Sequence, residues 1–312
     1  MFRNSNILVP TDFSPYANCA MKYGVSIAKQ YEGNVHFVHV LDAAVVSGAR
    51  GSNMWLTRAE TDTLLDSMRE HASSRLTSLV QAASGAGVTA EQHIVQGNAS
   101  QEILRLALDL RCTLIVLATH GRSGFDHVVF GSVAEKVVRQ SPVPVLAIKH
   151  PEHEFVKEYD LSLDIQRILF PTDFSAFSEK ALPFAASLCR EFSATLALLH
   201  ATEIPVVLPE FMPDSVMAIG PEMEVMARQT LDRMKESMEG VTVEGISVTG
   251  VPHREICRYA EDHHVDLIIM PTHGRSGLGH VLFGSVAEKV VRLARCPVLT
   301  IRPEWDGPEP LS

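Results

Sequence analysis

Short apolar runs alternate with longer stretches of helical periodicity along the whole chain. In the first half the apolar runs are Ile7–Val9, Val35–Val40, Gln92–Val95, Leu114–Ala118 and Val143–Ile148. The runs are unbroken rather than alternating, which is typical of parallel strands covered on both faces. Strand followed by helix, repeated in this way, predicts an α/β fold: a five-stranded, doubly wound parallel sheet with helices on both faces.

The helical stretches carry their apolar residues on one side. In "SQEILRLALDL", which ends at Leu110, the residues Ile103, Leu104, Ala107 and Leu108 share one face of a helix. We expect that face to pack on the sheet.

Ligands of an open parallel sheet bind beyond the carboxyl ends of the strands, where the strand order reverses. Three segments of the first half follow the ends of predicted strands. They are Asp12, His39–Asp42 and Thr119–Gly124. This edge of the sheet is where we expect a binding site.

The pattern occurs twice. "ILVPTDFSPYANCA" at Ile7–Ala20 returns as "ILFPTDFSAFSEKA" at Ile168–Ala181, and other blocks return in the same order. We therefore predict two homologous domains joined head to tail. The expected boundaries are residues 1–150 for the first domain, 151–165 for a linker, 166–303 for the second domain and 304–312 for a tail.

Composition narrows the class of protein. The chain is 46% hydrophobic, enough for buried cores, and its formal net charge is −10. An acidic chain lacks the basic face that nucleic acid or an anionic membrane requires, so neither is an expected partner. The five cysteines are odd in number and form no close pair, which fits free thiols in a reducing compartment. We expect a cytoplasmic protein.

The best-preserved repeat combines a polar loop with a helix start. "THGRSG" is followed by "GSVAEKVV", in which Val133, Val137 and Val138 have helical spacing, so Gly131 and Ser132 open a helix. A helix N-terminus exposes unpaired N–H groups and a positive dipole end, which suit a phosphate. Glycine there allows a close approach and a positive φ. The same letters fit a capping box, in which serine and glutamate satisfy their own helix, and both interpretations stay open.

The order of these motifs closely resembles that of the universal stress proteins. "PTDFS" follows the first strand, "HV" ends the second, "THGRSG" follows the fourth, and "GSVAEKVV" opens the last helix. The resemblance covers nearly all of the chain and is closest to a tandem member with two Rossmann-like domains. It implies a stress-response sensor or regulator that binds ATP or a related adenine nucleotide, with or without Mg²⁺.

The resemblance also implies roles at the adenosine end of the site. Asp12 would accept hydrogen bonds from ribose or base, and Val40 would offer main-chain groups to the adenine edge. Pro10 and Thr11 would form the wall beneath the sugar. An alternative for Asp12 needs no ligand: it is then a charge at the start of the next helix, which Ser14 caps.

Backbone N–H groups of Gly121, Gly131, Ser132 and Val133 would bind the phosphates. His120 and its counterpart His273 would touch a phosphate or brace the loop. The predicted nucleotide-binding residues of the first domain are Pro10, Thr11, Asp12, Val40, Ala118, His120, Gly121, Gly131, Ser132 and Val133. Those of the second domain are Pro171, Thr172, Asp173, Ala201, His273, Gly274, Gly284, Ser285 and Val286.

The chain departs from the family motif at one position. Nucleotide-binding members carry G-x-x-G, nine residues and then G-[ST], whereas the first glycine is Ala118 in one copy and Pro271 in the other. Alanine keeps its backbone N–H, but proline has none to donate. We therefore expect the first domain to be the better site.

Catalytic and metal-binding motifs are missing from the sequence. There is no GxxxxGK[ST] loop, no Ser-His-Asp order and no nucleophile elbow, so we assign no catalytic residues and expect at most weak ATP turnover. Among the histidines, His263 and His264 are adjacent on a predicted helix end and would not face together. His150 and His153 lack a ligand set at a recognisable spacing. We therefore expect no metal site.

An alternative function needs no nucleotide. The last strands of the two halves, within Val143–Lys149 and Pro297–Arg302, are natural sheet edges that seek partners. In the family such strands pair across a pseudo-twofold axis. The two domains of this chain could pair in that way, or two chains could form a homodimer, and the protein would then be an interaction scaffold.

Overall fold

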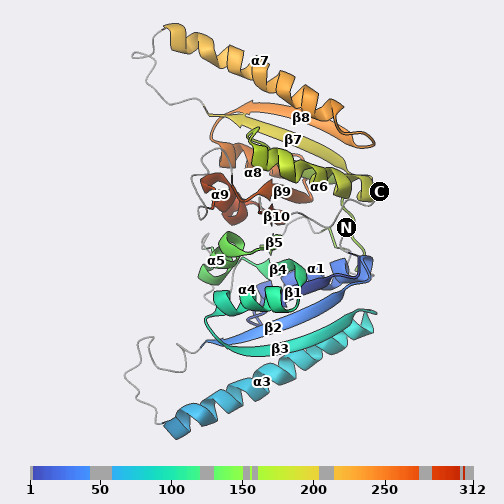
Figure 1. Ribbon diagram of the computed structural model, residues 1–312, viewed down its shortest axis with the longest axis vertical. Helices are drawn as coiled ribbons and strands as arrows, with labels where there is room; N and C mark the ends of the chain where they lie inside the picture. The colour runs from blue at the N-terminus through green and yellow to red at the C-terminus, as the bar shows by residue number, and fades with distance from the viewer. Residues whose placement is uncertain are drawn as a thin grey trace. The chain divides into compact units, whose positions relative to one another are not determined.

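The computed structural model describes residues 3–42, 58–119, 130–149, 155–156, 161–203, 214–273, 283–302 and 305 (Figure 1). The chain divides into two compact units. Unit 1 comprises Met1–Lys149 with Val156–Leu163, and unit 2 comprises His150–Phe155 with Asp164–Ser312. Each unit contributes five parallel strands with helices around them, so the predicted α/β fold class is confirmed.

Unit 1 has the strand order β3-β2-β1-β4-β5, and the order reverses between β1 and β4. Every neighbouring pair is parallel. The carboxyl ends of β1 and β4 therefore flank the crevice in which such sheets bind ligands. The elements are β1 (Asn6–Pro10), α1 (Pro15–Gln30), β2 (Asn34–Asp42), α3 (Arg58–Gly85), β3 (Thr89–Gly97), α4 (Ala99–Asp109), β4 (Cys112–Ala118), α5 (Ser132–Gln140) and β5 (Val145–Ile148).

Two expectations about burial are wrong. β3 is the outermost strand of unit 1, and each of its residues is exposed or half-buried, so it is not covered on both faces as its apolar run suggested. In α4 the buried apolar residues are Ile103, Leu106 and Ala107, whereas Leu108 is 59% exposed. Steps of three and four from Ile103 reach both Leu106 and Ala107, and Leu108 lies one position beyond that stripe.

Unit 2 has the strand order β10-β9-β6-β7-β8. The register repeats that of unit 1: Asn6 aligns with Asn34 in one unit, and Arg167 aligns with Thr195 in the other. The duplication therefore holds residue by residue across the first two strands of each unit. The elements are β6 (Arg167–Pro171), α6 (Ala176–Phe192), β7 (Thr195–Thr202), α7 (Asp214–Glu236), β8 (Thr242–Thr249), α8 (Pro252–Asp262), β9 (Leu267–Pro271), α9 (Ser285–Leu293) and β10 (Val298–Ile301).

The segment between the repeats divides between the two units. Val156, which is buried, forms an antiparallel bridge with Leu163 in unit 1. Near the end of the chain, the ring of Trp305 lies 5.0 Å from that of Phe184, edge to face, in unit 2. An aromatic contact thus attaches the start of the predicted tail to α6.

Within each unit, the buried thiols and the partly exposed thiol should differ sharply in reactivity. Cys112, Cys189 and Cys296 are buried, and burial raises the pKa of each thiol to about 12. Because the thiolate is the reactive form, we expect a thiol-specific reagent at pH 8 to modify at most Cys19 and Cys257 in the native protein. Titration in denaturant should detect all five thiols. Rapid reaction of a third thiol in the native protein would contradict the burial of Cys112, Cys189 and Cys296.

Candidate functional site

The last helix of unit 1 begins without a side-chain cap. Ser132 is the first residue of α5, Gly131 is the N-cap, and no side chain accepts a hydrogen bond there. The capping-box interpretation is therefore wrong, because Ser132 lies one position too late to be the cap. In α1, by contrast, the Oγ of Ser14 accepts from the N–H of Ala17.

The first amides of α5 are consequently unused by the described part of the chain. The N–H groups of Ser132, Val133 and Ala134 make no hydrogen bond within those residues, and the first helical bond comes from Glu135 to the Gly131 carbonyl. These three donors stand at the positive end of the helix dipole. The arrangement suits an anion.

Gly131 itself has a different role from the predicted one. Its N–H donates to the carbonyl of Thr119 at 2.8 Å, so it is not available to a phosphate, and its φ of −61° is not positive. Both expectations are wrong. A Cβ at this position would lie 3.1 Å from the Thr119 oxygen, so glycine is needed for the close approach of the two backbones. Gly284 repeats this arrangement against Thr272, at 2.7 Å.

A cavity of about 250 Å³ opens at the switch point of unit 1. It lies between the carboxyl ends of β1, β2 and β4 and the starts of α4 and α5. His120 and Gly121 lie outside the described residues. All the other predicted residues line the cavity: Pro10, Thr11, Asp12, Val40, Ala118, Gly131, Ser132 and Val133.

The turn after β1 fixes the position of Asp12. The N–H of Ser14 donates to Oδ1 of Asp12 at 2.9 Å, and the N–H of Phe13 donates to Oγ1 of Thr11 at 3.0 Å. Phe13 has a φ of 64°, in the left-handed region. Asp12 thus serves the start of α1, as one interpretation predicted, and also borders the cavity, as the other requires.

His39 supports that turn, a role that the sequence did not predict. Its Nδ1 donates to the carbonyl of Thr11 at 2.8 Å, and its ring stacks on Phe13 with centroids 4.5 Å apart. Arg75 covers the other side, with its guanidinium 4.5 Å from the centre of the Phe13 ring. The sequence does carry a signal for this role, because the same three residue types recur in unit 2. There His200, Thr172 and Phe174 repeat both contacts.

Unit 2 has a cavity of about 370 Å³ at the equivalent place. Met223 of α7 and Glu203 line it in addition to the predicted residues. Gly274 lies outside the described residues. The predicted residues on its wall are Pro171, Thr172, Asp173, Ala201, His273, Gly284, Ser285 and Val286.

The two cavities differ at the aspartate. Oδ1 of Asp173 accepts from the Ser175 N–H at 3.0 Å, the Ser175 Oγ at 2.6 Å and the Ser178 Oγ at 2.7 Å. The residue at the place of Ser178 in unit 1 is Ala17, which offers no hydroxyl. Three hydrogen bonds from its own chain leave the carboxylate of Asp173 less able to accept from a ligand.

A second difference concerns the end of the fourth strand of each unit. In unit 2, Nδ1 of His273 lies 2.9 Å from Oγ1 of Thr272, a contact that braces the loop start. Pro271 ends β9 without an N–H, whereas Ala118 ends β4 with one.

Comparison with known proteins identifies relatives over the whole chain. The family model described as the universal stress protein family matches residues 3–149 and 164–302. The universal stress protein Slr1230 of Synechocystis sp. is 26% identical over 312 residues, covering 95% of this chain and 99% of that protein. The universal stress protein YxiE of Bacillus subtilis is 34% identical over 148 residues, covering 44% of this chain and 98% of that protein.

A solved structure shares the fold over the same length. The crystal structure of a universal stress protein from Archaeoglobus fulgidus matches with a TM-score of 0.71 and 23% sequence identity. It covers 96% of this chain and 97% of its own. Among the described residues, no helix is long and apolar enough to cross a membrane.

Proposed function

The chain belongs to the universal stress protein family, and we propose that it binds ATP or a related adenine nucleotide and acts as a sensor or regulator in the stress response. One observation carries this proposal. The uncapped amides at the start of α5 border a cavity at the switch point of the unit 1 sheet. Helix N-termini at this place in a parallel sheet favour phosphate groups.

The remaining walls of the cavity suit an adenosine. Val38, Val40 and Ile103 provide apolar surface for a base. Asp12, half-buried at the rim, can accept from ribose hydroxyls. The apolar walls and the amide donors thus match the two ends of a nucleotide.

The proposal places the stronger site in unit 1. Ser178 Oγ donates a hydrogen bond to Asp173, whereas Ala17, at the equivalent place in unit 1, has no hydroxyl to donate to Asp12. Pro271 removes a further donor from unit 2. We expect one nucleotide to bind tightly per chain and a second to bind weakly.

Equilibrium dialysis of nucleotide-stripped full-length protein with ATP tests this assignment. Replacing Asp12 with alanine should lower affinity by about tenfold or more, because a hydrogen bond to a charged group is worth about 1.5–3 kcal/mol. Asp173→Ala is the matched control and should leave the tight site unchanged.

Two outcomes would contradict the proposal in different ways. Equal losses in both variants would refute the ranking of the units. Absence of bound ATP at millimolar concentration would refute nucleotide binding and favour the nucleotide-independent interaction protein instead.

A cytoplasmic location is part of the same proposal. None of the five cysteines forms a disulfide, and a reducing compartment keeps cysteines as thiols.

A further inference from the structure

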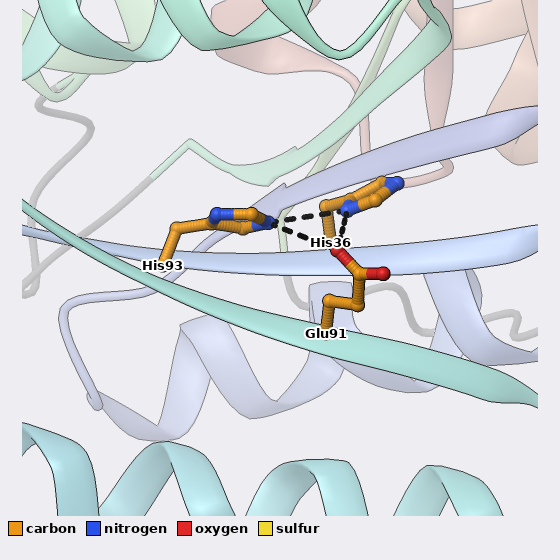
Figure 2. A group of neighbouring side chains, drawn as sticks. All are labelled: His36, Glu91 and His93. Carbon is orange, nitrogen blue, oxygen red and sulfur yellow. Dashed lines mark hydrogen bonds and ion pairs between the residues drawn. The ribbon is translucent and has the colours of Figure 1, made fainter.

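Two histidines and a glutamate from neighbouring strands meet on one face of the unit 1 sheet (Figure 2). His36 lies on β2, and the parallel register sets it opposite Glu91 on β3. His93 follows Glu91 by two residues, so both side chains of β3 are on the same face. Figure 2 shows the three side chains converging between the two strands.

The donor atoms are spaced as ligands of one ion would be. Nδ1 of His36 lies 3.1 Å from Nε2 of His93 and 3.5 Å from Oε2 of Glu91, and the last two atoms are 4.0 Å apart. Ligands at 2.0–2.1 Å from a tetrahedral ion would be about 3.3 Å apart. We propose that His36, Glu91 and His93 form a binding site for a divalent transition-metal ion, best matched by Zn²⁺.

The chemistry of the donors selects the class of ion. Two imidazole nitrogens and one carboxylate oxygen suit zinc and its neighbours better than Mg²⁺ or Ca²⁺, which prefer oxygen. When Nδ1 of His36 presents its lone pair, the ring proton lies on Nε2, which is buried without a hydrogen-bond partner among the described residues.

The three side chains differ in their exposure to solvent. The side chain of His36 is 7% exposed, that of His93 is 21% exposed and that of Glu91 is 62% exposed. An ion can therefore enter past the glutamate of the outer strand. Three protein ligands leave a fourth position for water.

Unit 2 shows what this position looks like without the histidines. The register there places Ala197 opposite Glu244, with Ile246 two residues later on β8. The glutamate is kept, but it forms an ion pair with Arg167, 2.6 Å away.

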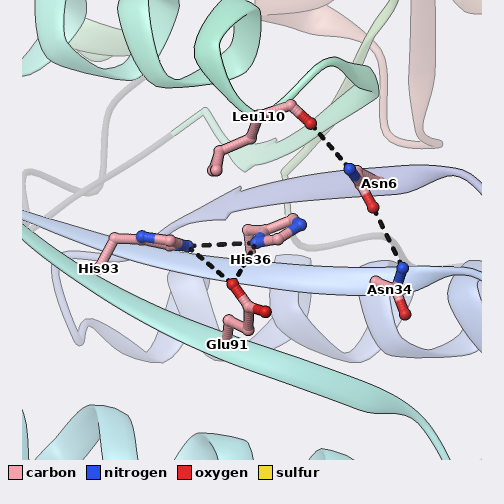
Figure 3. A network of polar contacts seen from close by, with 6 residues as sticks. All are labelled: Asn6, Asn34, His36, Glu91, His93 and Leu110. Carbon is pink, nitrogen blue, oxygen red and sulfur yellow. Dashed lines mark hydrogen bonds and ion pairs between the residues drawn. The ribbon is translucent and has the colours of Figure 1, made fainter.

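In unit 1 the residue equivalent to Arg167 is Asn6. Its amide donates to the carbonyl of Leu110 and its Oδ1 accepts from Asn34 (Figure 3). Figure 3 shows that this contact chain is separate from the cluster. The arginine that neutralises the carboxylate in unit 2 is thus replaced, and two imidazoles stand beside the carboxylate instead.

The sequence expectation of no metal site rested on other histidines. Glu91 and His93 are two residues apart, the spacing of side chains on one face of a strand. His36, however, precedes His93 by 57 residues. Only the register of β2 and β3 brings the three together, and the sequence does not give that register.

Metal titration of chelator-treated, nucleotide-free full-length protein tests the site. We expect one Zn²⁺ per chain to bind and to raise Tm, since a ligand that binds only the folded state stabilises it. His93→Ile, which copies unit 2, should weaken Zn²⁺ binding at least tenfold. Losing a residue that only supports a ligand typically costs about 10–100-fold in metal affinity, and His93 is itself a proposed ligand. His71→Ala removes an exposed histidine of α3 and should change nothing.

Co²⁺ provides a spectroscopic check of the ligand type. Bound by nitrogen and oxygen, it should show visible ligand-field bands without thiolate charge transfer. Absence of Zn²⁺ binding in the wild type, unchanged affinity in both His93→Ile and Glu91→Gln, or a thiolate spectrum would each overturn the assignment. None of these results depends on whether ATP binds.

Discussion

Replacing Ser132 with proline should lower the affinity for ATP by about 10- to 100-fold and leave the fold intact. Proline at the first helical position removes one of the three uncapped amides, and a hydrogen bond to a charged group is worth about 1.5–3 kcal/mol. The backbone accepts the change. Gly131, at φ −61° and ψ 132°, already has the conformation that a following proline requires.

The same chain shows that such a helix start is stable. Pro15 and Pro252 occupy the first positions of α1 and α8. Ser132→Ala, which removes the hydroxyl but keeps the amide, is the control and should bind ATP almost normally. Calorimetric titration of both variants with ATP would separate the role of the Ser132 amide from that of its hydroxyl. Equal ATP affinities in the two variants would show that the amide takes no part.

Replacing Gly24 with valine should destabilise the protein by about 3 kcal/mol, the upper part of the usual range for overpacking. Gly24 is buried in α1, and a Cβ there would lie 2.5 Å from Cγ2 of Val9 on β1. Val9 is fully buried, so its methyl group has little room to move. Denaturant unfolding measures the effect.

Two further variants make this result specific. Gly85→Val introduces the same side chain at the exposed end of α3, where an added Cβ meets nothing within 4 Å, and should cost much less. Combining Gly24→Val with Val9→Ala should recover part of the loss, because the two side chains compete for one space. If the free-energy costs of Gly24→Val and Val9→Ala simply add in the double variant, the contact between residues 24 and 9 does not limit the packing of α1.

The repeated strand and helix order could be predicted from the sequence because it depends on local apolar runs. β1, β2 and β4 lie inside the sheet, and their runs identify them. β3 was misjudged in burial because an outer strand and an inner strand share the same short apolar run. The burial of Leu106 instead of Leu108 has the same origin: periodicity predicts a stripe, but the neighbouring elements decide where its edge lies.

The position of the candidate site could also be predicted, because the carboxyl ends of strands meet at the switch point. Its hydrogen bonds could not. Gly131 and Thr119 are twelve positions apart, and only the fold shows that the glycine amide is already engaged. Ser178 is visible in the sequence as a replacement of Ala17, but its effect depends on the 2.7 Å contact with Asp173.

The most direct test is a crystal structure of the full-length protein with a non-hydrolysable ATP analogue at millimolar concentration. We expect phosphate oxygens within hydrogen-bonding distance of the Ser132 and Val133 amides, the ribose beside Asp12 and the adenine between Val40 and Ile103. Density for the analogue at another place, or none in the unit 1 cavity, would contradict the account.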